Sequence, residues 1–255
     1  MGEYHDAFVR GLEWMWGEGF MSPGGAEEVA RLLGDTPVSG AKVLDVGCGI
    51  GGIDVALVND HGASEVIGID VDPGLVDRAT QLITEKGLNG QVSVQCVEPG
   101  PLPFADESFD VVFSKDSLVH IPDKAAIYRE IFRVLRPGGF MAVSDWLGNG
   151  LPSSEVMQEW EKVLGLTFSL GTLAESVAEV ERAGFINVES EDRNAWYAED
   201  MRNEIALLSG ENYPHLVAAI GEEAANQRLT SSSAKLKVVD NGELRPGHIR
   251  GQKPA

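Results

Sequence analysis

The chain has 255 residues, a length that allows one large hydrophobic core with an added cap. Its 40 acidic and 20 basic side chains give a formal net charge of -20, which would repel a phosphate backbone and excludes nucleic acid as a substrate. No apolar run approaches the roughly 20 residues that cross a membrane, and the N-terminus lacks the basic and apolar regions of a signal peptide. Together with only two cysteines, these features predict a cytoplasmic protein without membrane partners.

The middle of the chain alternates between apolar runs of strand length and amphipathic stretches of helical length. Strands are predicted over 43–46, 66–69, 92–97, 111–114 and 140–144. Helices are predicted over 24–33, 53–59, 73–86 and 124–134. This alternation with short loops predicts an α/β protein with a doubly wound, mostly parallel sheet that helices cover on both faces.

The second half continues this rhythm only in part. A helix over 172–183 ends at Gly184 and precedes a strand over 185–190. The segments 148–170 and 193–225 are mostly helical, with aromatic residues interspersed, and we expect them to cap the carboxyl edge of the sheet, where open sheets bind ligands. Residues 245–255 are expected to form a final strand with a loose tail.

A glycine-rich turn follows the first predicted strand. Gly47, Gly49 and Gly52 have the spacing G-x-G-x-x-G, which lets the backbone approach a ligand closely and is shared with dinucleotide-binding proteins. Asp70 ends the second strand, where a carboxylate can accept hydrogen bonds from both hydroxyls of a ribose. Asp45 precedes the glycines, where its charge would repel a pyrophosphate but suits the cationic amino or sulfonium group of S-adenosylmethionine.

The region from Lys42 to Asp145 resembles the class I S-adenosylmethionine-dependent methyltransferases. Besides the glycine turn and Asp70, it has the strand Phe109-Asp110-Val111-Val112-Phe113-Ser114 and the turn Leu135-Arg136-Pro137-Gly138-Gly139, in the family's order. The resemblance implies a Rossmann-like fold, with S-adenosyl-L-methionine as cofactor and S-adenosyl-L-homocysteine as product. The cofactor residues that it implies are Met21, Ser22, Asp45, Gly47, Gly49, Asp70, Val71, Glu98 and Lys115.

The N-terminal 146 residues further resemble the phosphoethanolamine N-methyltransferases. The resemblance lies in Tyr4-His5-Asp6, in the run Trp14-Met15-Trp16-Gly17-Glu18-Gly19-Phe20-Met21-Ser22-Pro23-Gly24-Gly25, and in Ser114-Lys115-Asp116-Ser117-Leu118-Val119-His120-Ile121. It implies that Tyr4 and His120 form a catalytic pair and that residues 1–25 fold over the site as a lid. Residues 26–147 would then form the cofactor-binding core, and residues 148–255 the cap helices and the last strands of the sheet.

Such a pair suits methylation of an amine. A free alkylamine is mostly protonated at neutral pH, whereas attack on a methyl carbon needs a lone pair in line with the breaking bond. An imidazole titrates near pH 6.5 in model peptides, so His120 is suited to take the proton while the Tyr4 hydroxyl orients the amine.

The expected substrate residues depart from the family in one respect. They are Tyr4, Asp116, His120, Trp146, Trp160, Phe168 and Lys235. Lys235 takes the place of a family lysine that binds phosphate, but the family's cap arginine has no counterpart and Trp146 replaces a tyrosine. A phosphate would lose strong charge-assisted hydrogen bonds without that arginine. We therefore expect another small amine, one that carries a carboxylate or an apolar body.

Other functions stay open at this point. Within the class, the protein could methylate oxygen, sulfur or carbon of a small metabolite, because a histidine base serves a hydroxyl equally well. Outside it, an NAD-dependent oxidoreductase or a non-catalytic S-adenosylmethionine-binding module would use the same glycine spacing. The five histidines show no metal-ligand spacing, so no metal is expected. A monomer and a homodimer are both compatible with the sequence.

Overall fold

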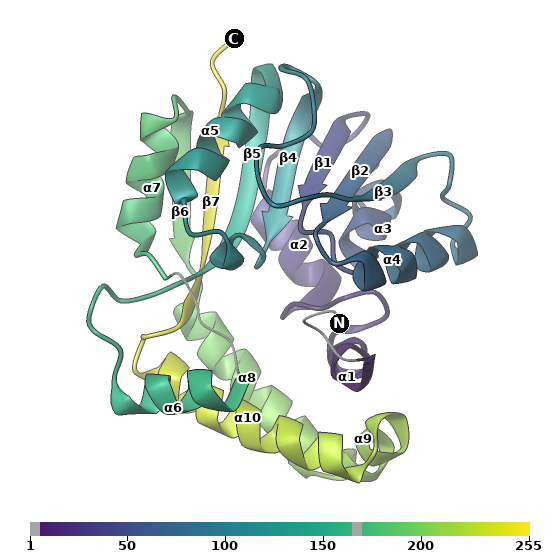
Figure 1. Ribbon diagram of the computed structural model, residues 1–255, viewed down its shortest axis with the longest axis vertical. Coiled ribbons are helices and arrows are strands. Elements are labelled where there is room, and N and C mark those ends of the chain that lie inside the picture. Colours follow the sequence, from purple (N-terminus) through teal and green to yellow (C-terminus); the bar gives the residue numbers. More distant parts are fainter. Residues whose placement is uncertain (1–5, 165–169) are drawn as a thin grey trace.

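The protein is built on one seven-stranded sheet (Figure 1). The structure is a computed structural model, and it describes residues 6–164 and 170–255. The strands are β1 (Lys42–Val46), β2 (Glu65–Asp70), β3 (Val92–Cys96), β4 (Phe109–Lys115), β5 (Leu135–Leu147), β6 (Ile186–Asp192) and β7 (Arg245–Gln252). Their order in the sheet is β3-β2-β1-β4-β5-β7-β6, and β7 runs antiparallel to all the other strands. The predicted fold class, a doubly wound and mostly parallel sheet, is confirmed.

Helices cover both faces of this sheet and one of its edges. They are α1 (Asp6–Trp16), α2 (Gly25–Leu33), α3 (Gly52–Asn59), α4 (Pro73–Glu85), α5 (Lys124–Val134), α6 (Glu155–Leu164), α7 (Leu173–Arg182), α8 (Asn194–Ser209), α9 (Tyr213–Ile220) and α10 (Glu222–Asp240), with a short 3-10 turn, η1 (Leu118–His120). Their local signals are visible in the sequence. Asp72 caps the N-terminus of α4 by accepting hydrogen bonds from the amides of Gly74 and Leu75. Thr172 and Glu175 form a capping box at the N-terminus of α7.

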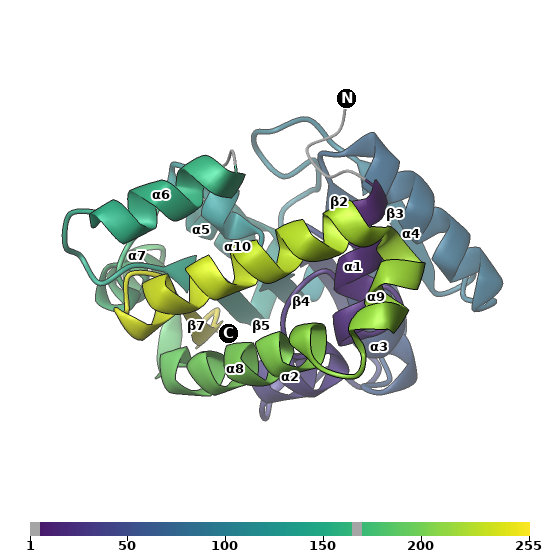
Figure 2. The ribbon, with the colours of Figure 1, turned by 90° about the horizontal axis from the view of Figure 1, so that it is seen from below.

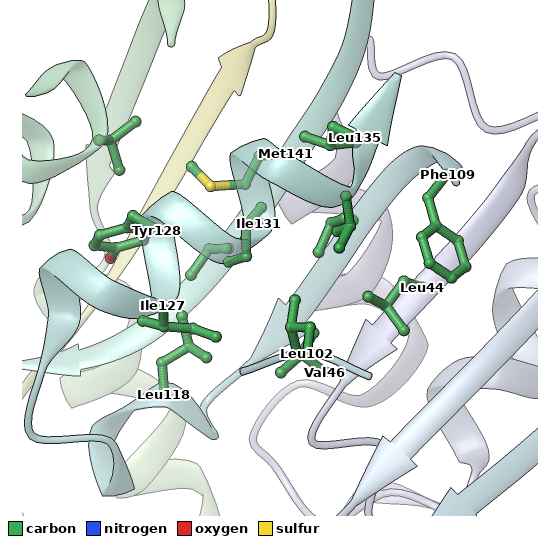
Figure 3. Packing of buried hydrophobic residues seen from close by; sticks show 14 of the residues in the cluster. Leu44, Val46, Leu102, Phe109, Leu118, Ile127, Tyr128, Ile131, Leu135 and Met141 are labelled. Atoms are coloured by element: carbon green, nitrogen blue, oxygen red, sulfur yellow. The ribbon is translucent and has the colours of Figure 1, made fainter. Parts of the chain in front are cut away.

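The hydrophobic core has one layer on each face of the sheet. Successive residues of a strand point to opposite faces, so Val43 belongs to the layer under α2, α3 and α4, while Leu44 belongs to the layer under α5 and α7. The second layer, shown in Figure 3, packs Tyr128 and Ile131 of α5 against Met141 of β5. All five side chains are essentially excluded from solvent, and full burial of each aliphatic one stabilises the fold by roughly 1.5–3 kcal/mol.

Two helices differ from the sequence prediction. The N-terminal segment contains α1, which was not among the predicted helices. The predicted helical cap stops at residue 225, whereas α10 continues to Asp240 and is the longest helix in the described part of the chain. The buried face of α10 consists of small or short side chains such as Ala225 and Ser232, so it lacks the apolar stripe that makes a helix recognisable.

The N-terminal helix and the cap helices gather at the edge where the parallel strands end. In Figures 1 and 2, α1, α6, α8, α9 and α10 lie together beyond the carboxyl ends of β1, β2 and β4. Helix α10 packs against α6, α8 and α9, and α1 packs against α9 and α10. Within 6–164 and 170–255, every helix is too short or too polar to cross a bilayer.

Candidate active site

The glycine turn after β1 is shaped for close approach. Gly47 has a φ of 83°, in the left-handed region, and a Cβ added to it would lie 2.3 Å from the Ser117 side chain. The amides of Gly47 and Cys48 donate to the carbonyl of Ile69 at 2.8 and 3.0 Å, which fixes the turn against the end of β2. A Cβ on Gly49 would approach Met21 Sδ at 3.2 Å. Met21, one of the predicted cofactor residues, therefore lies over the turn.

Asp70 at the end of β2 is held over this turn. One carboxylate oxygen accepts from the amide of Gly49 at 2.9 Å and the other from the amide of Asp72 at 3.0 Å. Each oxygen has a second lone pair, so the carboxylate can still accept hydrogen bonds from a diol. Next to it, Val71 is 55% exposed, and Glu98 lies exposed just after the adjacent strand β3. The three predicted cofactor residues share one stretch of the sheet edge.

Asp45 lies in β1, and its side chain is excluded from solvent. Neither carboxylate oxygen has a hydrogen-bond partner among the described residues. Burial, and then the charge of Asp70, raise the pKa of Asp45 to about 8. A buried carboxyl without a partner is costly, so this position favours a ligand that brings a cationic hydrogen-bond donor.

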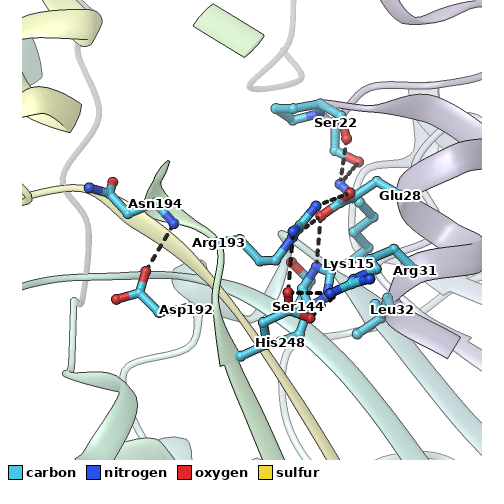
Figure 4. A network of polar contacts seen from close by, with 12 residues as sticks. Ser22, Glu28, Arg31, Leu32, Lys115, Ser144, Asp192, Arg193, Asn194 and His248 are labelled. Carbon is cyan, nitrogen blue, oxygen red and sulfur yellow. Dashed lines mark hydrogen bonds and ion pairs between the residues drawn. The ribbon is translucent and has the colours of Figure 1, made fainter. Parts of the chain in front are cut away.

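Lys115 at the end of β4 joins the N-terminal segment to the sheet (Figure 4). Its Nζ donates to Ser22 Oγ and to the carbonyl of Pro23, both at 3.0 Å, and forms an ion pair with Asp116 at 2.7 Å. Asp116 has a φ of 58°, and its other oxygen accepts from Ser144 Oγ at 2.8 Å. The predicted residues Ser22, Lys115 and Asp116 thus form one buried network, whose contacts hold the segment after α1 in place.

His120 ends the 3-10 turn that follows β4, and its side chain is exposed at the sheet edge. Lys124 fixes this turn because its Nζ donates to the carbonyl of Leu118 and pairs with Asp145 at 3.0 Å. Burial raises the pKa of Asp145 to about 6, against the opposing effect of Lys124. Tyr4, the predicted partner of His120, lies outside the described residues.

Three aromatic rings surround the end of Lys235 in the cap. Its Nζ lies 4.2 Å from the ring centre of Trp146, 5.0 Å from that of Tyr197 and 5.8 Å from that of Trp160. Enclosure within the cap lowers the pKa of Lys235 to about 8. The structure thus brings three predicted substrate residues together, while Phe168 lies outside the described residues.

Sequence reasoning missed Tyr197 as a member of this cage. Its ring meets that of Trp146 edge to face, with the centroids 4.9 Å apart, and its side chain is 1% exposed. The available signal was an aromatic residue in a segment already assigned to the cap. Nothing in the local sequence distinguishes Tyr197 from Trp196 beside it.

A second missed feature is the buried cluster shown on the right of Figure 4. The carboxylate of Glu28 in α2 accepts two hydrogen bonds from the Arg193 guanidinium, both at 2.8 Å. The same carboxylate lies 3.1 Å from Nε2 of His248 in β7. Burial acts to raise the pKa of Glu28, but the neighbouring His248 and Arg193 lower it to about 2. The cluster connects α2 to the start of α8 and to the last strand.

The family model described as "Methyltransferase domain" matches residues 44–143. This stretch begins in β1 and ends in β5, and contains the glycine turn, Asp70 and His120. Residues 44–143 are therefore similar to methyltransferase domains. The predicted resemblance of this region to the methyltransferases is confirmed.

Similarity to known proteins extends over almost the whole chain. The chain is 33% identical over 254 residues to the phosphoethanolamine N-methyltransferase of Triticum aestivum, and the match covers 98% of the chain and 49% of that relative. It therefore spans about half the length of the curated relatives that it matches. The predicted resemblance to this family is confirmed.

Two solved structures share its fold. The phosphoethanolamine N-methyltransferase 2 of Haemonchus contortus, solved with phosphomonomethylethanolamine and S-adenosylhomocysteine, has a TM-score of 0.90 at 24% identity and covers 99% of this chain and 59% of that one. A putative sarcosine dimethylglycine methyltransferase from Galdieria sulphuraria has a TM-score of 0.80 at 21% identity and covers 98% of this chain and 97% of that one. Both likenesses show the Rossmann-like fold.

Proposed function

We propose that this protein is an S-adenosylmethionine-dependent methyltransferase that methylates the nitrogen of a small amine. The observation that carries the proposal is the corner between β1 and β2, where Asp45 is buried without a partner and Asp70 is fixed over the glycine turn. The methyltransferase domain and the relatives named above support the same activity.

The residues at this corner fit the cofactor. The unsatisfied oxygens of Asp45 suit its α-ammonium group, and the remaining lone pairs of Asp70 suit its ribose hydroxyls. The exposed side chain of Val71 offers an apolar surface for adenine, and Glu98 lies nearby to accept from its amino group. When bound, the cofactor supplies a methyl group activated by a sulfonium. A dinucleotide would instead bring a pyrophosphate toward a second acidic residue, so an NAD-dependent oxidoreductase fits less well.

His120 is the residue that we assign to proton transfer. It lies at the carboxyl end of β4, on a turn that Lys124 holds in place. From there it removes a proton from the substrate ammonium, directly or through water, and leaves the nitrogen lone pair free. We expect Tyr4 to complete the pair from the N-terminal segment, with residues 1–25 as the lid, 26–147 as the cofactor-binding core and 148–255 as the cap and last strands.

The cap favours an amine that also carries a carboxylate. The ammonium of Lys235 faces the aromatic rings of Trp146, Trp160 and Tyr197. A single ammonium matches the charge of a carboxylate better than that of a dianionic phosphate, which is usually bound by a bidentate arginine. Methylation of oxygen, sulfur or carbon remains the second candidate, since the exposed His120 serves any of these acceptors.

Two further proposals concern the protein as a whole. We place it in the cytoplasm, because Cys48 and Cys96 are both free thiols. Its working form is proposed as a monomer or homodimer that acts on a small molecule and not on nucleic acid.

A transfer assay with radiolabelled S-adenosylmethionine tests the choice of acceptor. We would compare simple amines, amino acids, phosphobases, phenols and thiols, using wild type, Lys235→Met and Lys237→Met. The result expected is highest turnover with a carboxylate-bearing amine, and a KM for it that Lys235→Met raises at least about tenfold, as loss of a charged hydrogen bond predicts. Lys237 lies exposed on the same helix, so Lys237→Met should leave this KM unchanged. A preference for phosphobases, or equal effects of the two variants, would contradict the assignment.

A further inference from the structure

A second carboxyl group lies beside Asp45 beneath the glycine turn. Asp45 in β1 is paired with Gly68 in β2, so the two residues face the same side of the sheet. A Cβ added to Gly68 would lie 2.7 Å from Asp54 Oδ1 and 2.9 Å from Cys48 Sγ. The Asp54 carboxyl, which reaches this point from the first turn of α3, therefore occupies the space that Gly68 leaves empty next to Asp45.

This carboxyl pair has no compensating group in the described structure. Both side chains are fully buried, and none of their four oxygens has a hydrogen-bond partner among the described residues. The titratable groups that act on the pair are Asp70 and Cys48, and both would carry negative charge if ionised. Around them, α3 and the neighbouring strands contribute apolar side chains such as Leu57 and Val66.

Two adjacent negative charges in such surroundings are strongly unfavourable. Burial and mutual repulsion therefore keep at least one proton on the pair at neutral pH. In agreement with this geometry, burial and then Asp70 raise the pKa of Asp45 to about 8, and burial and then Asp45 raise the pKa of Asp54. The two groups titrate together, so the proton belongs to the pair.

We propose that Asp54 is a positioning residue of the cofactor site, which shares a proton with Asp45 in the free protein, and that the pair releases this proton when the cofactor's α-ammonium binds at Asp45. The O–H bond of the carboxylic acid breaks, its electron pair stays on the carboxylate, and the proton passes to the buffer. The ammonium keeps its own proton and supplies the missing cationic donor. This inference rests on the cofactor assigned under the proposed function and is independent of the methyl acceptor.

Calorimetric titration of the full chain with S-adenosylhomocysteine tests the proposal. This ligand keeps the α-ammonium group but has no sulfonium charge, so it isolates the amino end. Binding would be measured at pH 7 in two buffers of different ionisation enthalpy, which yields the number of protons released. Wild type should release about one proton, and its Kd should rise about tenfold for each pH unit below neutrality.

Two variants separate the pair from its surroundings. Asp54→Asn removes one acid of the pair at nearly constant shape and with it the repulsion between the two carboxyls, so proton release should fall below that of wild type and the dependence of Kd on pH should become weaker. Asp60→Asn is the matched control, because Asp60 is exposed at the other end of α3. It should behave as wild type. Unchanged proton release in Asp54→Asn, or none in wild type, would overturn the proposal.

An infrared measurement tests the same proposal on the wild-type protein alone, so its outcome does not depend on whether a variant folds. The difference spectrum between free and S-adenosylhomocysteine-bound protein should show loss of a protonated-carboxyl carbonyl band and gain of carboxylate bands. Binding without this change would overturn the role of the pair and leave the proposed function standing. A complete absence of S-adenosylhomocysteine binding would instead contradict the proposed function.

Discussion

Asp70 shows how one side chain can organise a turn and still have capacity for a ligand. Its two oxygens accept hydrogen bonds from the amides of Gly49 and Asp72, and each oxygen keeps a second lone pair for another donor. The sequence predicted the residue and its place at the end of a strand. It did not predict that Asp70 also fixes the glycine turn, because that contact depends on how the turn folds back over β2.

Asp70→Ala is expected to weaken S-adenosylhomocysteine binding by about 1.5–3 kcal/mol, the usual contribution of hydrogen bonds to a charged group. Isothermal titration calorimetry measures this change. Asp77→Ala on the exposed face of α4 is the control and should leave the affinity unchanged. Equal affinities for Asp70→Ala and wild type would remove Asp70 from the cofactor site.

His120→Ala is expected to lower kcat at least about 100-fold, the lower range of general base catalysis, because the substrate ammonium would then keep its proton. Cofactor affinity should stay within about twofold of wild type, since the substitution leaves the glycine turn, Asp45 and Asp70 unchanged. Single-turnover kinetics together with S-adenosylhomocysteine titration separate the two effects. Normal turnover would show that another group takes the proton.

Among the secondary-structure elements, the strands were easier to predict from the sequence than the cap helices. A strand such as β4 carries a continuous apolar run over 111–113 because helices cover both of its faces. Helix α10 instead buries only Ala225, Ser232, Val238 and Val239, which do not form a continuous apolar stripe. The lysine and tryptophans of the cap were identified individually, but the cage that they form with Tyr197 depends on how β5, α6, α8 and α10 meet.

The contact between α2 and α8 could not be read from sequence at all, because Glu28 and Arg193 are 165 residues apart. Arg193→Met should destabilise the protein by about 3–5 kcal/mol, since it leaves the buried Glu28 carboxylate with His248 as its remaining described partner. Arg202→Met is the control: its pair with Asp240 is exposed, so we expect a loss of about 1 kcal/mol or less. Urea unfolding of the two variants measures the difference.

The same pair makes an acid-dependent contribution to stability. The pKa of Glu28 is lowered to about 2 from an ordinary value of 4.5, so its contribution is fully present above pH 4.5 and is lost as the pH falls toward 2. The stability difference between wild type and Arg193→Met should shrink over this interval. A difference that stays constant between pH 5 and pH 3 would show that Arg193 does not hold Glu28 in its charged form.

For the whole molecule, the pH dependence of stability reports on the buried Asp45 carboxyl. Because the pKa of Asp45 is raised from 3.8 to about 8, the folded protein binds more protons than the unfolded chain between these values, and its stability decreases as the pH rises. Asp45→Asn removes this effect. We expect the wild type to lose stability relative to Asp45→Asn from pH 5 to pH 8 in urea unfolding, and parallel curves would contradict the buried, protonated state.

The arrangement of the molecule also explains which parts of the function were predictable. The proposed class of reaction rests on the glycine turn, Asp45 and Asp70, which lie within 25 residues of one another in the sequence and on the adjacent strands β1 and β2. The acceptor depends on the cap, where residues from α6, α8 and α10 meet the end of β5. Local sequence therefore indicates the reaction class, but it does not indicate the acceptor.

The most direct test of the central claim is to identify the atom that receives the methyl group. The protein would be incubated with S-adenosylmethionine carrying an isotopically labelled methyl carbon and with the best acceptor from the screen, and the product examined by NMR. The account predicts a labelled methyl on nitrogen and one S-adenosylhomocysteine formed for each methyl transferred. A labelled methyl on oxygen, sulfur or carbon, or no transfer to any acceptor while S-adenosylhomocysteine binds, would contradict it.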